Sequence, residues 1–391
     1  MQLFEFQSVL FNFHDLILLM TALQCLFFGI LLCVTNNHRI KSTFFLAGFL
    51  FVHALIPLHE LIMWGAEFKL QVRETWPQVY FIPGLAYFID GPLLYLCIKS
   101  LVFRGFSLKK IDLLHLLPLL IYAVFMVATF YSQPYDLRLS MINTESFVYS
   151  ASYVGIEFFS KWVRVVYAVA CFILISRYKT LLQDKHSNVE KVHISWLSAL
   201  VLGFMVVMLS ETILVGAKVV NLFESFGNLV FMTIGLTGNY VSFILVNLLV
   251  FSAIRHFSIF VQVTEEEPNK KIIEEPFVNP EMAADVDTAI RKDKTYMEPD
   301  ITLDTLAESL SIMPRDLSML INRHFGINFY EFINKYRIEE AKRMLLAPEY
   351  KNTNITDIYL AVGFNSKSVF YTFFKKSEGV TPSKFRDAGS Q

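Results

Sequence analysis

The chain has 391 residues, and 54% of them are hydrophobic, including 38 Phe. This composition, with a mean hydropathy of +0.46, excludes an ordinary soluble protein. The excess of apolar residues precedes about residue 254, and residues 262–391 have the composition of a globular domain, so the formal net charge of −1 averages two unlike parts.

Seven apolar stretches precede residue 254, each close to the ~20 residues with which a helix crosses ~30 Å of hydrocarbon. They are His14–Val34, Thr43–Trp64, Val79–Leu101, Leu113–Ser132, Ile156–Tyr178, Ile194–Gly216 and Asn228–Ser252. We therefore predict a seven-helix transmembrane bundle over residues 1–254. No basic segment precedes the first stretch, so a cleaved secretory signal is not expected.

The distribution of Lys and Arg between the connecting segments predicts the orientation of this bundle, because positive residues are retained in the cytoplasm. One set of segments carries eleven: Arg39, Lys41, Lys99, Arg104, Lys109, Lys110, Arg177, Lys179, Lys185, Lys191 and Arg255. The opposite set carries four: Lys69, Arg73, Arg138 and Lys218. With seven spans, this bias places the N-terminus outside and the C-terminus in the cytoplasm.

Ionisable residues within the apolar stretches are candidates for a ligand site, because such groups face the interior of a bundle and pair or line a wet cavity. They are His59, Glu60, Asp90, Glu157, Lys161, Arg164 and Glu211. Glu157, Lys161 and Arg164 share one helical face. Three alternatives stay open. The charged residues form an internal ion network, with Glu157, Lys161 and Arg164 paired to Glu60 and Glu211, that fixes helix packing; or Lys161 and Arg164 bind a polar or anionic ligand in a pocket; or the span boundaries differ and these groups lie in headgroup water.

The sequence lacks the short patterns that hold metals or catalytic groups. Its four cysteines, Cys25, Cys33, Cys97 and Cys171, lie in or at the ends of apolar runs without paired spacing, so neither a disulfide nor a zinc site is expected. There is no HExxH pattern and no serine-histidine protease pairing. We therefore expect no catalytic residue, no metal site and no cofactor, and predict that the chain is not an enzyme.

Residues 255–284 have the composition of a linker. Acidic residues cluster at 265–267 and 274–275, and Pro268, Pro276 and Pro280 interrupt any long helix. A flexible segment of about 40 residues would span ~35 Å, so we predict a short tether between two domains.

From Asp300 onward, apolar residues recur with a helical period that predicts two helix-turn-helix units. In the first unit Thr302 is a candidate N-cap, residues 311–313 form the turn, Pro314 opens the second helix and Gly326 ends it. The predicted inward-facing residues of this unit are Leu303, Leu306, Ala307, Leu310, Leu317, Leu320 and Ile321.

A long helix, FYEFINKYRIEEAKRMLL, is expected to connect the units. Its predicted buried side is Phe329, Phe332, Ile333, Tyr336, Ile338, Ala341 and Leu345. In the second unit Asn354 or Thr356 starts a short helix, Gly363 provides the turn and Ser366 caps a helix that runs to about Ser377. The predicted core of this unit is Ile355, Ile358, Leu360, Ala361, Val369, Phe370, Phe373 and Phe374.

The segment GFNSKSVFYTFFKKSEGVTPSKFR, from Gly363 to Arg386, resembles the signature of AraC/XylS-type transcription regulators. The resemblance extends upstream through FINKYRIEEAKRMLL and covers about 100 residues. It implies an all-α fold in which the bundle is followed by a cytoplasmic DNA-binding domain over residues 285–391. The runs FIDGPLLYL and LLHLLPLL also resemble the membrane region that is fused to AraC-type domains in some bacterial sensors.

The family pattern implies which residues contact double-stranded DNA. Base-facing positions are Arg315, Ser318 and Met319 in the first unit, and Lys367, Ser368, Tyr371 and Thr372 in the second. Phosphate contacts are Asn322, Arg323, Arg337, Lys375 and Lys376. Met319 stands where a polar reader is common, so the first unit is expected to contact a thymine methyl or to read DNA shape.

Together these features predict a regulator in the bacterial inner membrane that senses an outside or in-membrane signal of unknown identity and binds specific DNA. Lipid and DNA are its expected partners, and a homodimer is left open. One alternative is a membrane enzyme or transporter with a DNA-binding tail, for which Asp90 beside Gly91 and Pro92 is the only supporting feature. Proteolytic release of the DNA-binding domain is a further variant.

Overall fold

The computed structural model describes residues 12–35, 41–65, 68–104, 106–189, 194–221, 228–256, 263–264 and 280–389. They divide into two compact units, Met1–Ile175 with Ser195–Thr264, and Ser176–Ile194 with Glu265–Gln391. The predicted linker lies largely outside the described residues. Strand β1 (Phe103–Arg104) pairs in parallel with β2 (Val263–Thr264), and the remaining regular structure in the described ranges is helical, in agreement with the all-α prediction.

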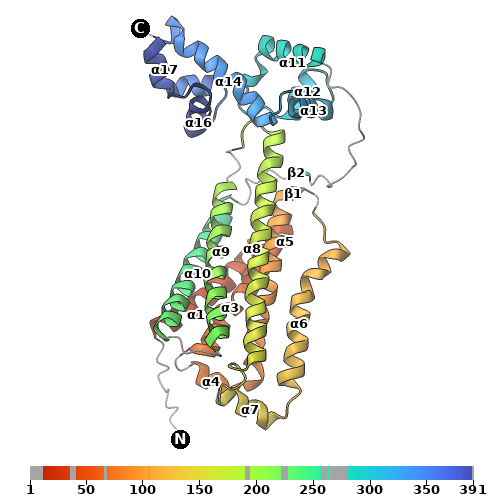
Figure 1. Ribbon diagram of the computed structural model, residues 1–391, viewed down its shortest axis with the longest axis vertical. Helices are drawn as coiled ribbons and strands as arrows, with labels where there is room; N and C mark the ends of the chain where they lie inside the picture. The colour runs from red at the N-terminus through yellow and green to blue at the C-terminus, as the bar shows by residue number, and fades with distance from the viewer. Residues whose placement is uncertain are drawn as a thin grey trace. The chain divides into compact units, whose positions relative to one another are not determined.

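Long helices packed side by side form the first unit (Figure 1). They are α1 (Phe13–Thr35), α2 (Lys41–His53), α3 (Leu55–Trp64), α4 (Phe68–Thr75), α5 (Ala86–Val102), α6 (Leu117–Met126), α7 (Tyr135–Asn143), α8 (Ala151–Lys185), α9 (Ile194–Asn221) and α10 (Asn228–His256). Helix α8 belongs to both units, because its residues from Ser176 onward group with the C-terminal helices.

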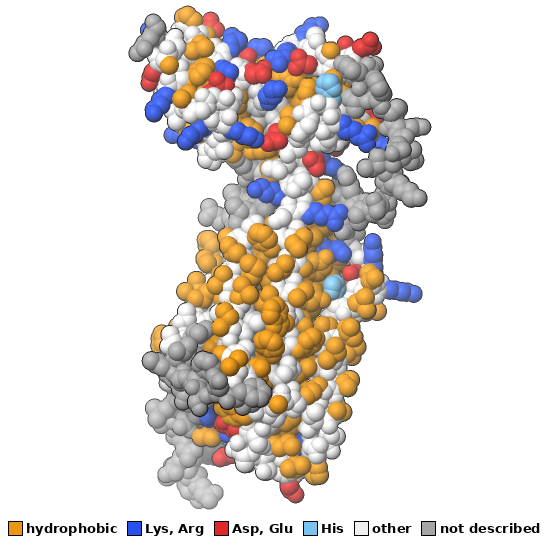
Figure 2. All heavy atoms as spheres, in the orientation of Figure 1, with side chains coloured by type: hydrophobic (Ala, Val, Ile, Leu, Met, Phe, Trp, Pro, Cys, Tyr) orange, Lys and Arg blue, Asp and Glu red, His pale blue; other side chains and the backbone are white. Residues whose placement is uncertain are grey.

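Six helical segments in the described ranges are long and apolar enough to cross a membrane, and they coincide with the first six predicted stretches. In α10, at the seventh stretch, the apolar part is the shorter Gly235–Leu249, so a seventh span stays a prediction. Hydrophobic side chains cover the face of the bundle that Figure 2 shows. Phe27 and Ile173 are each 61% exposed, a pattern that suits a lipid environment.

The second predicted span is two helices rather than one. Helix α2 ends at His53 and α3 begins at Leu55. Pro57 has no N–H to donate to the carbonyl of His53, so the hydrogen-bond ladder is interrupted at this point.

A cluster of aromatic rings forms the core of the first unit at one end. The Phe81 ring centroid lies 4.9 Å from Phe130, 5.3 Å from Phe147 and 5.5 Å from Tyr153. Phe88 stacks on Tyr122 at 4.6 Å. These large, fixed side chains hold the segments that line a small cavity described below.

The second unit contains α11 (Pro280–Asp293), α12 (Leu303–Ser309), α13 (Pro314–His324), α14 (Phe329–Leu346), α15 (Ile355–Ala361), α16 (Lys367–Glu378) and α17 (Pro382–Gly389). It has two hydrophobic cores, and α14 contributes to both. Residues of α14 up to Tyr336 pack with α11, α12 and α13, whereas those from Ile338 pack with α15 and α16. All seven residues predicted for the buried side of α14 are buried.

Most of the predicted helix boundaries of this unit are confirmed. The Thr302 hydroxyl accepts a hydrogen bond from the amide of Thr305 at 3.2 Å, Pro314 is the first residue of α13, and Gly326 follows α13 with φ +69°. Helix α11 includes residues that were predicted as linker, because it begins at Pro280 and buries Ala283.

Three predictions in the second helix-turn-helix unit were wrong in detail. Leu360 is 48% exposed and Ala361 is exposed, because α15 turns Ile358 and the following Val362 toward the core instead. Ser366 occupies the N-cap position of α16, but its hydroxyl lies 3.2 Å from that of Ser368 and caps no backbone amide.

Candidate functional site

The predicted DNA-contacting residues of α13 lie on one exposed stripe. Arg315, Asn322 and Arg323 are exposed, and Ser318 and Met319 are half-buried. Their spacing of three and four residues places them on the same helical face, while Leu317, Leu320 and Ile321 anchor the opposite face in the core. The Asn322 amide lies 3.4 Å from the Ser318 hydroxyl, so adjacent polar groups on this stripe contact each other.

The predicted residues of α16 form a second stripe. Lys367, Ser368 and Thr372 are exposed and Tyr371 is half-buried, while Phe370 and Phe374 fill the core behind them. The Lys367 ammonium lies 5.5 Å from the centre of the Tyr371 ring, one helical turn away, where a cation and a ring attract each other. This stripe offers short hydroxyls, one cation and one aromatic ring to a ligand.

Two lysines at the C-terminal end of α16 fit the role of phosphate contacts by their exposure. Lys375 and Lys376 are both exposed. The Lys376 ammonium lies 3.1 Å from a carboxylate oxygen of Glu331 on α14, and its side chain is 72% exposed. Exposed ion pairs contribute ~0–1 kcal/mol, so a phosphate could replace Glu331 at little cost.

Arg337 does not fit the predicted role of a phosphate contact. Its side chain is 1% exposed, at the point on α14 between the two cores. It donates hydrogen bonds of 2.7 Å to the carbonyls of Tyr296 and Glu298. Burial lowers the pKa of Arg337 to about 10, against the attraction of Asp300, so the guanidinium stays charged at neutral pH. Arg337 therefore acts inside the domain.

The same guanidinium contacts Ser187, a residue for which the sequence contained no signal. Ser187 lies two residues after Lys185, the last residue of α8, and groups with the C-terminal helices. Arg337 donates to its carbonyl at 3.4 Å and to its hydroxyl at 3.3 Å. The amide and the hydroxyl of Ser187 in turn donate to the carbonyl of Ile301, at 3.2 and 2.8 Å. The end of α8 is thus hydrogen-bonded to the segment before α12 and to α14.

In the first unit, four of the predicted polar residues form a buried ion network. Arg164 donates to Asp90 at 3.0 Å and also to Glu211, and Lys161 donates to Glu211 at 3.0 Å. His53 Nδ1 lies 3.3 Å from the other oxygen of Asp90. These contacts match part of the ion-network alternative, with Asp90 as an additional member. The other two predicted members do not join it, because Glu157 pairs with Lys218 and Glu60 accepts from the Tyr87 hydroxyl.

A glycine allows the helices that carry this network to approach closely. A Cβ atom added to Gly91 on α5 would lie 2.9 Å from the Cβ of Tyr167 on α8. Because Gly91 has no side chain, the neighbouring Asp90 and Arg164 can meet although they are 74 positions apart in the sequence. Pro92 follows within α5, which continues to Val102.

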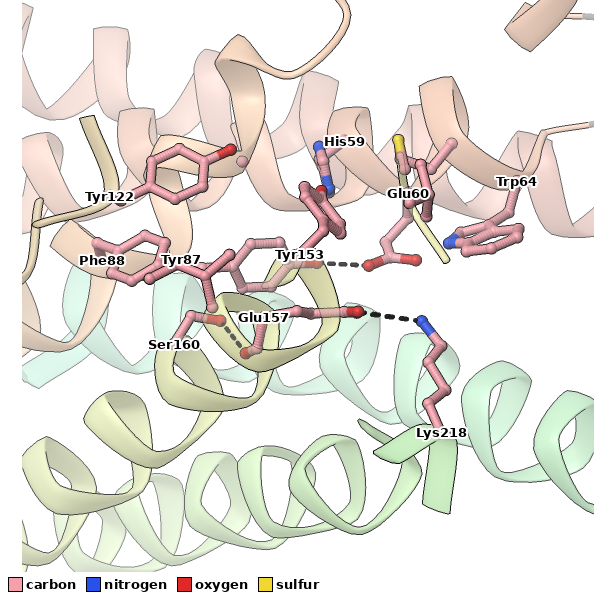
Figure 3. A pocket seen from close by; sticks show the side chains of 14 residues that line it. His59, Glu60, Trp64, Tyr87, Phe88, Tyr122, Tyr153, Glu157, Ser160 and Lys218 are labelled. Atoms are coloured by element: carbon pink, nitrogen blue, oxygen red, sulfur yellow. Dashed lines mark hydrogen bonds and ion pairs between the residues drawn. The ribbon is translucent and has the colours of Figure 1, made fainter. Parts of the chain in front are cut away.

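The remaining predicted residues, His59, Glu60 and Glu157, line a small cavity next to the aromatic core (Figure 3). Its volume is about 30 Å³, room for about two water molecules. Lys218 on α9 points toward Glu157, and the two form an ion pair at 3.1 Å. The hydroxyl of Tyr87 donates a hydrogen bond to Glu60.

Comparison with known proteins places the C-terminal unit in a family. Residues 306–388 match the family model described as a helix-turn-helix domain. The chain is 33% identical over 90 residues to the probable transcription factor PqrA of Proteus vulgaris, which is 23% of this chain and 71% of PqrA. It is 34% identical over 94 residues to the bifunctional transcriptional activator/DNA repair enzyme AdaA of Bacillus subtilis (strain 168), which is 24% of this chain.

A third relative is the uncharacterized HTH-type transcriptional regulator YtdP of Bacillus subtilis (strain 168), 33% identical over 89 residues, which are 23% of this chain. The chain spans 11% of the length of YtdP and 43% of that of AdaA. No solved structure matches the chain. Because the similarity covers most of PqrA, and α12, α13, α15 and α16 form two helix-turn-helix units, this chain belongs to the AraC family of DNA-binding transcription regulators.

Proposed function

We propose that the chain is a membrane-embedded one-component regulator, in which a signal received by the helical bundle changes DNA binding by the C-terminal unit. Six apolar helices and the excess of Lys and Arg in alternate connecting segments support an inner-membrane location with a cytoplasmic C-terminus. The AraC-type unit supplies the output. The contacts described next support a sensing role for the bundle.

The arrangement of the C-terminal unit supports contact with two successive stretches of one DNA face. The stripes on α13 and α16 would enter the major groove, as recognition helices of helix-turn-helix units do. Helix α14 has 18 residues, which correspond to ~27 Å, of the same order as one DNA turn of ~34 Å. Lys375, Lys376 and Arg323 would then fix the position on phosphates.

The observation that carries the sensing proposal is the continuity of α8. This helix has 35 residues, and it bears Lys161 and Arg164 of the ion network. The same helix continues to Lys185, two residues before Ser187, which is hydrogen-bonded to Ile301 and Arg337. A change in the network that moves α8 can therefore reach Arg337 through an unbroken helix.

A signal can act this way only if it binds one arrangement of the bundle more tightly than another. A buried network of paired charges suits this requirement, because breaking one partner of a buried pair is costly and discrete arrangements result. The Asp90–Arg164–Glu211 contacts would thus fix one arrangement of α5, α8 and α9.

The proposal can be tested without knowledge of the signal. Arg164→Gln disturbs the network and should change transcription from a promoter that the protein occupies in cells, measured with a reporter. Thr180→Pro interrupts α8 between the network and Ser187, since proline breaks helix interiors. In the Thr180→Pro background, Arg164→Gln should no longer change the reporter signal.

Thr180→Ala is the matched control, because Thr180 is exposed and alanine preserves the helix. The Arg164→Gln effect should persist in this background. Immunoblots must show equal amounts of all variants, and purified Thr180→Pro protein must still bind the promoter DNA. An Arg164→Gln effect of the same size in both backgrounds would refute transmission through α8.

A further inference from the structure

We propose that the cavity lined by His59, Glu60 and Tyr87 binds a protonated amine, with the Glu60 carboxylate as its counter-ion. The proposal deepens the sensor function proposed above and rests on it for the biological meaning of binding. It differs from the sequence-based alternative of an anionic ligand on Lys161 and Arg164, because the structure assigns both of those cations to carboxylate partners.

Glu60 is the carboxylate of this region that lacks a basic partner. Asp90 pairs with Arg164, Glu211 with Lys161 and Arg164, and Glu157 with Lys218. Across the described ranges, no Lys or Arg nitrogen lies within 4.0 Å of Glu60, which accepts a hydrogen bond from the Tyr87 hydroxyl. Glu60 is half-buried, and a carboxylate that is partly removed from water without a counter-ion is destabilised, so a cationic ligand would stabilise it.

His59 supplies a second, independent indication. Its side chain is 7% exposed, and its Nδ1 atom has no hydrogen-bond partner among the described residues. A Cβ atom on the adjacent Gly84 would lie 3.2 Å from His59 Cε1 and 2.9 Å from the Tyr122 hydroxyl, so the glycine leaves space beside the ring. A neutral imidazole that accepts at Nδ1 needs a donor, and a primary ammonium group has three.

The walls and the size of the cavity also favour an ammonium group. Trp64, Phe88, Tyr122 and Tyr153 contribute aromatic rings to its lining, and the Lys218 ammonium lies 5.1 Å from the centre of the Trp64 ring, so this wall already attracts a cation. In the view of Figure 3, Tyr122 and Phe88 lie to the left of His59, and Trp64 lies to the right of Glu60. A volume of about 30 Å³ is enough for one ammonium group. Either a small free amine or the ethanolamine headgroup of a lipid would present this group.

Calorimetric titration of the full chain in nanodiscs of phosphatidylglycerol tests the proposal, with ethylamine hydrochloride as the probe at constant ionic strength. We expect saturable binding of ethylammonium and none of ethanol or propionate at equal concentrations. Glu60→Gln should weaken ethylammonium binding about tenfold or more, because the negative charge that attracts the ammonium group is lost. Glu74→Gln, which changes an exposed carboxylate on α4, should bind like the wild type.

A variant with the opposite sign guards against loss of binding through misfolding. Lys218→Met removes the cation that neutralises Glu157 and should tighten ethylammonium binding about threefold or more. Three results would each overturn the proposal: no saturable binding of ethylammonium to the wild type, equal binding of propionate, or wild-type affinity in Glu60→Gln.

The same titration identifies the source of the amine. If the lipid headgroup occupies the cavity, replacing half of the phosphatidylglycerol by phosphatidylethanolamine should weaken ethylammonium binding through competition. Unchanged affinity assigns the cavity to a free amine. The titration contains no DNA, so it tests the site separately from the sensor function. If ethylammonium binds but the promoter reporter does not respond to it, the sensor function is refuted and the site stands. If the reporter responds but ethylammonium does not bind, the site alone is refuted.

Discussion

Replacement of Arg337 by methionine should destabilise the C-terminal unit without removing a DNA contact. Arg337 is 1% exposed and makes two hydrogen bonds of 2.7 Å to the carbonyls of Tyr296 and Glu298. Each charged hydrogen bond contributes ~1.5–3 kcal/mol to stability. Removal of the buried guanidinium also removes the desolvation cost of its charge, which offsets part of this loss. We therefore expect a loss of ~2–4 kcal/mol in the free energy of unfolding of this unit.

Amide hydrogen exchange of the full chain measures this loss locally. Where exchange follows the opening equilibrium, a loss of ~2–4 kcal/mol makes the most protected amides of α14 exchange ~30- to 800-fold faster. Arg343→Met is the control on the same helix, because Arg343 is 53% exposed and pairs with Glu340 at 2.7 Å. Its loss should change exchange less than about fivefold.

DNA binding separates this internal role from a phosphate contact. If Arg337 bound a phosphate, Arg337→Met would reduce the dependence of log affinity on log salt by about one unit. We expect an unchanged salt slope for the folded fraction. Wild-type exchange rates together with a reduced slope would refute the assignment of Arg337 to the interior.

Three further predictions concern the same unit. Gly363→Ala should lower the free energy of unfolding, measured by hydrogen exchange, by ~2 kcal/mol or more, because Gly363 has φ +96° and a Cβ atom would lie 2.7 Å from the Met297 carbonyl oxygen. Gly326→Ala should lower it less, because Gly326 has φ +69° and open space around its Cα. Lys367→Ala should relax sequence preference in binding to a DNA library, whereas Lys376→Ala should weaken binding to all sequences and lower the salt slope, and equal effects would contradict these roles. Burial and the Lys185 charge lower the pKa of His186 from 6.5, although the attraction of Asp304 opposes them. The contacts of the neighbouring Ser187 should therefore be fully stable above pH 6.5 and weaken as the pH falls below it. Protection of the Ser187 amide from hydrogen exchange that does not change between pH 7.5 and 5 would contradict this.

The sequence alone determined α12, α13, α14 and α16 of the C-terminal unit and most of the faces that they bury. The spacing of Leu317, Leu320 and Ile321 encodes a buried face because a helix repeats every 3.6 residues, and Thr302 and Gly326 mark ends through local hydrogen bonding and backbone conformation. The first six apolar stretches were equally local, since length and composition suffice to recognise them. The DNA-contacting residues from Arg315 to Arg323, by contrast, came from the resemblance to AraC-type regulators.

Tertiary structure decided which buried polar groups meet. Arg337 and Lys376 are both cations in an amphipathic pattern, and only the packing of α14 between two cores places the first inside and leaves the second outside. Asp90 and Arg164 pair across 74 positions, and Ser187 and Ile301 across 114. Such contacts depend on the approach of whole helices, so no local pattern encodes them. Only they distinguish the carboxylates that pair with a Lys or Arg from Glu60, which has no such partner among the residues that the structure describes.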